Sequence, residues 1–171
     1  YTNSGKFGVL SSSGKIIIDT IYDFIGIPER KSILPPPPDD GQFKMAADHF
    51  IVSKKESGVA IFSLSGKKIF DFVKCHFIAY DKATQTVVIT QKSEKNIERS
   101  TLHDLKGNQL IEGNFEGIGY VTRSDLLALI AQDGYIDEYY LYNCKNKKKT
   151  GPYSVLNVYN EDSSPFGMSE E

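Results

Sequence analysis

The chain has little of what would identify an enzyme, a membrane protein or a metal protein. Its only two cysteines, Cys75 and Cys144, lack a CxxC partner, so neither a zinc site nor a disulfide framework is encoded. No apolar run approaches the roughly 18 to 20 residues of a membrane span, and no nucleophile elbow, phosphate-binding loop or dinucleotide fingerprint is present. A formal net charge of -2 offers no sequence-wide attraction to nucleic acid. We therefore expect no cofactor and no specific nucleic-acid partner, and the compartment is left open.

What is present points to β-structure. A length of 171 residues, of which 40% are hydrophobic, is enough for one domain with a genuine core. Aromatic and β-branched residues recur in short alternating runs between glycines, whereas helical periodicity is scarce. The composition predicts a single all-β domain over residues 1–171.

One turn sequence recurs along the chain. In segments 9–15, 61–67 and 102–108 a polar residue is followed three positions later by a glycine. A fourth copy, at 141–147, has Asn146 in place of the glycine. Asparagine is the residue that best tolerates the left-handed backbone after glycine. Positions 14, 66, 107 and 146 lie 52, 41 and 39 residues apart, which is the size of a four-stranded antiparallel meander.

Aligning the chain on these turns predicts units of four strands, named a to d. The expected a strands are 24–27, 77–80, 118–121 and 155–158; the b strands 49–53, 86–90 and 126–131; the c strands 59–63, 97–103 and 136–143; and the d strands 15–18, 68–72, 108–111 and 147–150. Segment 124–132 suits a short helix by propensity, but its apolar run before Asp133-Gly134 favours a buried strand.

The domain is therefore expected to be a propeller-like or open repeat array. It has a partial unit at 5–19, units at about 24–72, 77–111 and 118–151, a lone strand at 155–158 and a polar tail at 160–171. Unpaired strand edges tend to pair with other strands, so such an array must be capped, pair with another chain, or belong to a longer polypeptide. We favour the last two, which include self-association through open strand edges.

The first copy also carries a family resemblance. Residues 5–18, GKFGVLSSSGKIII, followed by Ile21-Tyr22-Asp23-Phe24-Ile25, resemble the bacterial WG-repeat family, in which an aromatic-glycine pair, a Gly-Lys turn, an aliphatic strand and a Tyr-Asp-x-Ile element recur. Later units keep the turn but have Ala60 and Thr101 where Gly8 stands, and none has the family's tryptophan. The resemblance implies a β-rich repeat array without known catalytic residues that binds other molecules. Residues 124–143 have a more general likeness to a β-propeller blade.

The chain has three histidines, His49, His76 and His103. Asp48-His49 and His103-Asp104 could seed a metal site or an acid-base pair, and His76 follows Cys75 directly. We favour the interpretation that all three are ordinary surface or half-buried histidines. Adjacent residues on a strand point to opposite faces, which argues against a catalytic pair of Cys75 and His76.

Two segments are candidate interaction sites. The first is a basic and aromatic cluster, formed by Lys145, Lys147 to Lys149, Tyr139, Tyr140, Tyr142 and Tyr153. Such a mixture can hold phosphates or stack on rings. A lysine-rich turn also protects an edge strand from pairing with other chains. Within the insertion 28–41, Pro35, Pro36, Pro37 and Pro38 force a polyproline II rod, which serves as a ligand for aromatic grooves or, as we favour, a stiff spacer. The interaction residues selected are Pro35, Pro36, Pro37, Pro38, Tyr139, Tyr140, Lys147 and Lys148.

These observations predict a non-catalytic binding or scaffold module that presents its repeat loops to a protein or other macromolecular partner. In an antiparallel meander the a-b and c-d connections share one edge, so the proline segment and the glycine tips are expected on the same side, where a partner would bind. The alternative is a propeller-type glycan hydrolase, which needs two carboxylates about 5 to 9.5 Å apart. Its candidate carboxylates are Asp71, Asp81, Asp125 and Glu138.

Overall fold

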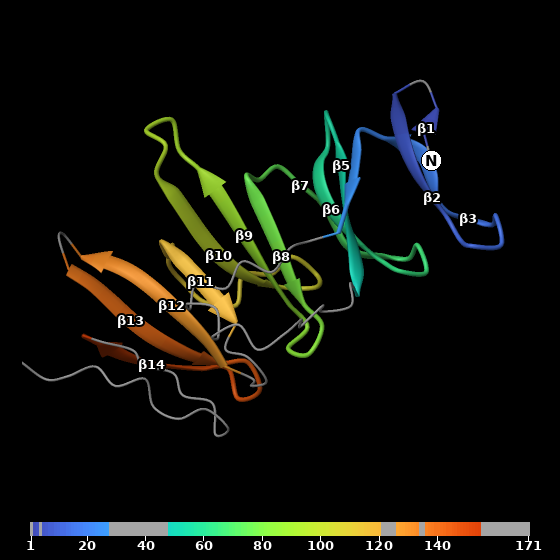
Figure 1. The fold of residues 1–171 in the computed structure, drawn as a ribbon. Coiled ribbons are helices and arrows are strands. Elements are labelled where there is room, and N and C mark those ends of the chain that lie inside the picture. The colour runs from blue at the N-terminus through green and yellow to red at the C-terminus, as the bar shows by residue number, and fades with distance from the viewer. Residues whose placement is uncertain (1, 4, 28–47, 121–125, 134–135, 155–171) are drawn as a thin grey trace, which may run out of the picture.

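The computed structural model describes residues 2–3, 5–27, 48–120, 126–133 and 136–154 (Figure 1). These residues form β-strands and no helix, which confirms the all-β prediction. The strands are β1 (Thr2–Asn3), β2 (Lys6–Leu10), β3 (Ile16–Tyr22), β4 (Phe24–Gly26), β5 (His49–Lys54), β6 (Gly58–Ser63), β7 (Lys68–Val73), β8 (Phe77–Asp81), β9 (Thr86–Lys92), β10 (Glu98–Asp104), β11 (Gly117–Tyr120), β12 (Leu126–Asp133), β13 (Ile136–Asn143) and β14 (Lys148–Tyr153). In this described part of the chain there is accordingly no helix that could cross a membrane.

The strands form four antiparallel sheets that follow one another along the chain. Sheet I has the order β1-β2-β3, sheet II β4-β5-β6-β7, sheet III β8-β9-β10 and sheet IV β11-β12-β13-β14. The sheets stand in a row with sheet I at one end and sheet IV at the other, so the described residues form an open array and not a closed barrel (Figure 1).

The segment for which helix and strand competed is a strand. Strand β12 pairs with β11 along one edge and with β13 along the other. Leu127 and Leu129 are fully buried, and Ala128 between them is buried as well. Burial of this kind outweighs the helix propensity of the segment.

One predicted strand is missing. Residues 108–111 form no strand, and the only pairing there is an isolated bridge between His103 and Gln109. The chain instead folds back so that Phe115 bridges to Ser100, and Ile111 and Phe115 are both buried. The prediction of a d strand was wrong here because two apolar side chains of this segment enter the core individually. The predicted strand 155–158 lies outside the described residues.

The recurring turns behave as the sequence predicts, with one exception. Gly14, Gly66 and Gly107 have φ angles of 81°, 83° and 87°. The polar residue three positions before each of them accepts a hydrogen bond from the amide that follows the glycine, as in Lys67 N to Ser63 Oγ at 3.1 Å. In the fourth turn Asn143 accepts backbone hydrogen bonds in the same way, from the amides of Lys145 and Asn146.

The exception is the residue in the left-handed conformation of that fourth turn. Lys147, with a φ angle of 58°, takes this conformation, so the prediction for Asn146 was wrong. Asn146 Oδ1 instead accepts a hydrogen bond from Lys148 N at 3.1 Å. In the other three turns the polar residue donates its amide to the carbonyl four positions on, as Ser63 does to Lys67, whereas Asn143 pairs with Lys148, five positions on. The fourth turn is therefore closed one residue later, which moves the left-handed position along by one.

Each pair of neighbouring sheets shares an apolar core, which gives three cores among the residues that the structure describes. Sheets I and II meet around Ile18, Val52, Ala60 and Phe62. Sheets II and III meet around Ile61, Phe70, Ile78, Tyr80, Val87 and Ile89. Sheets III and IV meet around Val88, Leu102, Ile111, Phe115, Leu127, Leu129 and Tyr142.

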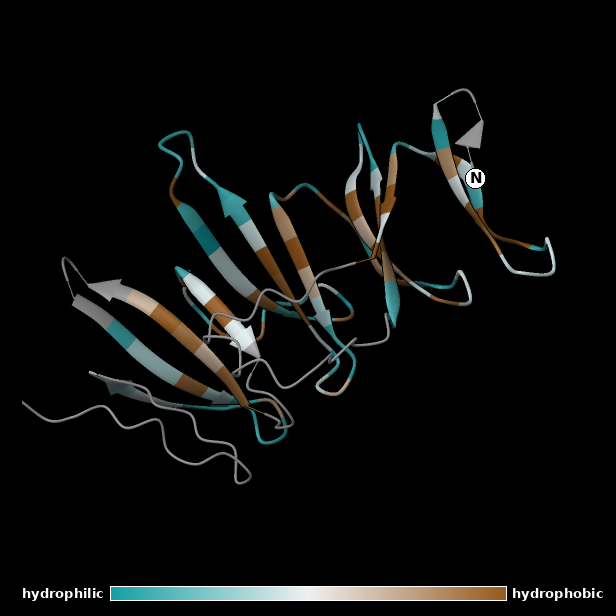
Figure 2. Cartoon of the chain, viewed as in Figure 1, coloured by the Kyte–Doolittle hydropathy of each residue, from teal (hydrophilic) through white to brown (hydrophobic). Residues whose placement is uncertain are grey.

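Successive residues of the middle strands serve different cores. In β5, Val52 belongs to the core with sheet I, whereas Ile51 packs on the core with sheet III; in β9, Val87 and Val88 divide in the same way. This follows from the alternation of side chains along a strand and explains the nearly continuous apolar runs in these strands (Figure 2).

The connections from a to b and from c to d share one edge, as predicted. His49, the first residue of β5, pairs with Ser63, the last residue of β6. The start of β5 therefore lies beside the turn at 64–67. The proline residues themselves lie outside the described part of the chain.

Candidate functional site

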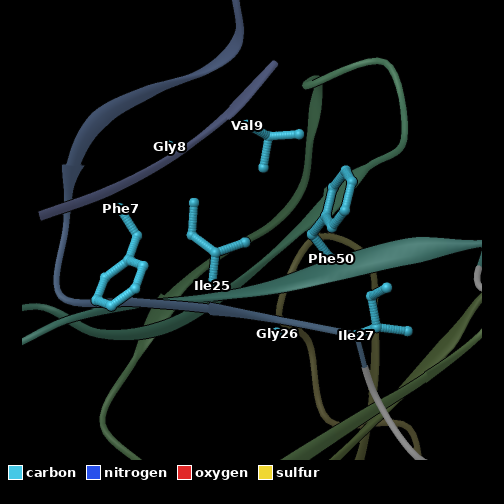
Figure 3. A pocket seen from close by; sticks show the side chains of 7 residues that line it. All are labelled: Phe7, Gly8, Val9, Ile25, Gly26, Ile27 and Phe50. Carbon is cyan, nitrogen blue, oxygen red and sulfur yellow. The ribbon is translucent and has the colours of Figure 1, made fainter. Parts of the chain in front are cut away.

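An apolar groove lies between sheets I and II (Figure 3). Its volume is about 370 Å³, within the range of small-molecule and peptide pockets. The residues that line it come from β2, from β4 with the residue after it, and from β5: Phe7, Gly8, Val9, Ile25, Gly26, Ile27 and Phe50. Not one of them carries a polar side chain, so the groove offers shape and apolar surface and no group for acid-base chemistry.

Two of the lining side chains are exposed although they are large and apolar. Phe7 is 39% exposed and Ile27 is 61% exposed. The groove is continuous with the core of sheets I and II, because Val9, Ile25 and Phe50 pack against that core. It is therefore an extension of a packed interface.

An ion pair fixes the position of β2 relative to β4. Lys6 Nζ lies 2.5 Å from Asp23 Oδ1, and Asp23 Oδ2 accepts a hydrogen bond from Lys55 N at 2.8 Å. The hydrogen bond from Lys6 is the main reason why the pKa of Asp23 lies below its ordinary value. Asp23 precedes β4 directly, so these contacts join the start of β2 to the start of β4.

A second hollow, lined by polar residues and a glycine, lies at the loop between β10 and β11. Its volume is about 420 Å³, and its lining residues are Gln109, which falls within the predicted d strand 108–111, and Glu112, Gly113 and Asn114, which follow it. Gln109 Nε2 donates to the carbonyl oxygens of Ile111 and Gly113 at 2.7 and 3.1 Å. The amide of Gln109 thus holds the loop itself, and Glu112 is the one titratable residue of this lining.

The predicted basic and aromatic cluster is divided between two faces of sheet IV. Lys149 Nζ lies 4.4 Å from the centroid of the Tyr140 ring. Tyr139 is paired with Tyr153, and the neighbouring residue Tyr140 points to the opposite face. The lysine of this contact is engaged by its own sheet, and Lys147 and Lys148 are exposed at and after the turn.

The histidines do not converge. His49 is buried in β5; its Nδ1 lies 2.5 Å from Asp48 Oδ1, and its Nε2 is buried without a hydrogen-bond partner. His103 Nε2 lies 2.8 Å from Thr101 Oγ1 within β10, and His76 Nε2 lies 3.3 Å from Glu98 Oε1. Among the described residues no three metal-ligating side chains come together.

Cysteine chemistry is also disfavoured at Cys75. Burial raises the pKa of its thiol to about 11. Because the thiolate is the nucleophilic form, this thiol is almost entirely unreactive at neutral pH. Its sequence neighbour His76 is engaged with Glu98, as described above.

The carboxylates named for a hydrolase stand on different sheets. Asp71 is in β7 of sheet II, Asp81 in β8 of sheet III and Glu138 in β13 of sheet IV, while Asp125 lies outside the described residues. Hydrogen bonding to Lys68 lowers the pKa of Asp71, which is the opposite of what a general acid needs. Asp81 Oδ2 accepts hydrogen bonds from Thr84, and Glu138 Oε2 accepts one from the Tyr140 hydroxyl.

The sequence reasoning missed the groove. Its seven lining residues are apolar or glycine and are spread over three strands, so no local motif marks them. Comparisons of the chain with protein-family models, with curated proteins and with solved structures found no match.

Proposed function

We propose that the chain is a non-catalytic binding module whose protein partner is held in the groove between sheets I and II. The observation that carries this proposal is the groove itself, an apolar surface that continues a packed core and leaves Ile27 exposed. Burying such apolar surface is the main favourable term in protein association. The resemblance of residues 5–25 to the WG-repeat family, whose members are expected to bind other molecules, supports the same function.

The groove also reaches the edge at which the loops are presented. Ile27 is the last described residue before segment 28–47, and Leu10 at the end of β2 leads into the turn at 11–15. A partner in the groove would therefore contact the turn side of the array, which is the side predicted from the meander.

Site-specific photo-cross-linking tests this function. A benzophenone amino acid is placed at Ile27 and, as the matched control, at Phe24, which is exposed to a similar extent (55%) on the same stretch of chain but outside the groove. In an extract of the source organism, we expect a polypeptide adduct at position 27 and not at position 24. The purified adduct partner should bind the Ile27→Asp variant about tenfold or more weakly than the unmodified chain, since the substitution puts a charge on the apolar surface.

Equal adducts at the two positions, or none at position 27, would refute a partner in the groove. A partner that binds Ile27→Asp as well as the unmodified chain would do the same.

A further inference from the structure

The face of sheet IV that is turned away from sheet III is apolar. Leu127, Leu129 and Tyr142 point into the core shared with sheet III, so the alternate residues of β12 and β13 lie on the opposite face, here called the outer face. This outer face carries two cross-strand pairs, Ala128 with Leu141 and Ile130 with Tyr139. Ala128 is only 4% exposed and the other three residues are half-buried, although within the described residues no further sheet stands on that side (Figure 1).

The strand registers show which positions of the other sheets correspond to this face. The first residue of each a strand pairs with one residue of the b strand: Phe24 with Ser53, Phe77 with Thr90 and Gly117 with Ile130. Two residues back along the b strand, the pair Ala128 with Leu141 of sheet IV corresponds to Ile51 with Ile61 of sheet II and to Val88 with Leu102 of sheet III. The pairs of sheets II and III lie in the cores that these sheets share with the next sheet along the row. The outer face of sheet IV is therefore the position at which a following segment of the array packs.

The outer face of sheet IV is also more apolar than the corresponding covered faces. Where sheet IV has Ile130 with Tyr139, sheet II has Ser53 with Val59 and sheet III has Thr90 with Ser100. An apolar sheet face is stable when it is buried against another element. Cover is therefore needed over sheet IV at least as much as over sheets II and III.

The chain that follows β14 has the pattern with which the earlier sheets begin. Before sheets II, III and IV the chain bends at one residue, whose amide donates to a carbonyl oxygen of the b strand at 2.8 to 2.9 Å; these residues are Asp23, His76 and Glu116. An isoleucine follows two positions later and packs in the core shared with the preceding sheet; these are Ile25, Ile78 and Ile118. The chain bends again at Ser154, directly after β14, and the residue two positions later is Leu156.

We propose that the outer face of sheet IV is a docking surface for segment 155–158 of the same chain, with Leu156 packed over Ala128 and Leu141. Leu156 then has the place at sheet IV that Ile78 has at sheet II. This inference is independent of the groove between sheets I and II. The outer face is then occupied from within the chain, which leaves the groove as an apolar surface open to a partner.

Nuclear Overhauser effects between methyl groups test this contact in the full chain. The methyl groups of alanine, isoleucine, leucine and valine are labelled, and the contacts of Ile78 within the core of sheets II and III serve as the internal reference. We expect contacts from the Leu156 methyl groups to those of Ala128 and Leu141. Leu156→Asp should abolish them and shift the Ala128 and Leu141 signals, because a charge is not accommodated on an apolar face.

The matched control is Asn157→Asp, at the neighbouring position. Adjacent residues of a strand point to opposite faces, so this variant should keep the contacts of Leu156 with Ala128 and Leu141. In both variants the methyl signals of sheets I to III should stay unchanged, which shows that the array remains folded.

Each other outcome contradicts the proposal. Contacts to Leu141 from Val155 and not from Leu156 would show a different register of the segment. Contacts that appear only between differently labelled copies in a mixed sample would show that a second copy covers the face. Absence of any contact from segment 155–158 to Ala128 or Leu141, or equal loss in both variants, would also overturn it. The cross-link at position 27 tests the groove separately, so failure of one proposal leaves the other standing.

Discussion

Gly66 is the point at which the turn of sheet II meets sheet I most closely. A methyl group on Gly66 would lie 2.0 Å from the carbonyl oxygen of Ile17 in β3, and the backbone there has a φ angle of 83°. Gly14 occupies the same place in the turn of sheet I, with a φ angle of 81°, and a methyl group there would meet nothing within 4 Å. Gly14→Ala therefore measures the conformational strain of the turn alone, and the additional loss of stability in Gly66→Ala measures the contact between sheets I and II.

The expected magnitudes follow from this difference. A non-glycine residue in the left-handed region costs about 1 to 2 kcal/mol, and both variants carry this cost. Only Gly66→Ala also forces the Ile17 carbonyl away from the turn, and overpacking of this kind adds about 1 to 3 kcal/mol. We expect Gly14→Ala to lower the free energy of unfolding by about 1 to 2 kcal/mol and Gly66→Ala by about 2 to 5 kcal/mol.

Urea denaturation followed by far-ultraviolet circular dichroism measures both values. Gly107→Ala, also in open space, is a second control with the same turn geometry. If Gly14→Ala and Gly66→Ala differ by less than about 0.5 kcal/mol, the turn of sheet II does not pack on β3 and the stacking of sheets I and II is wrong.

Two further predictions concern titratable groups. The pKa of Asp23 is lowered chiefly by its hydrogen bond from Lys6, so its stabilising contribution is complete above the ordinary value of 3.8 and is lost as the pH falls through the lower folded pKa. The free energy of unfolding, measured by urea titration at successive pH values, should therefore fall less steeply in acid for Asp23→Asn than for the parent chain. The same dependence on pH in both proteins would contradict the Lys6 contact. The pKa of Cys75 is raised to about 11, which predicts slow alkylation of this thiol by iodoacetamide at pH 8 in the folded Cys144→Ser variant. In urea the same thiol should be alkylated fast. Equally fast labelling of the folded chain would show that Cys75 is not buried.

Much of the fold was predictable because the turns are local. The left-handed residue at Gly14, Gly66 and Gly107 and the polar side chain three positions earlier are determined within a few residues, and the strands follow by alternation on each side. Strand β12 was predictable because it is apolar on both faces, as a strand between two sheets must be.

The predictions failed where packing at a distance decides the structure. The loop that replaces strand 108–111 depends on the burial of Phe115 against sheets III and IV, and nothing within the turn sequence signals that contact. The left-handed conformation of Lys147 depends on the pairing of Asn143 with Lys148, which closes the fourth turn one residue later than the others. The groove could not be read from a motif, since its seven lining residues belong to β2, β4, β5 and the position after β4 and come together only through the packing of sheets I and II.

The three separate cores also determine how the molecule would respond to force. Each core joins only two consecutive sheets, so tension along the row passes through one apolar interface after another. Under such tension the interfaces act in series and the weakest one yields first. Among the described residues the core of sheets I and II has four buried side chains, against six and seven in the other two, so we expect this interface to yield first.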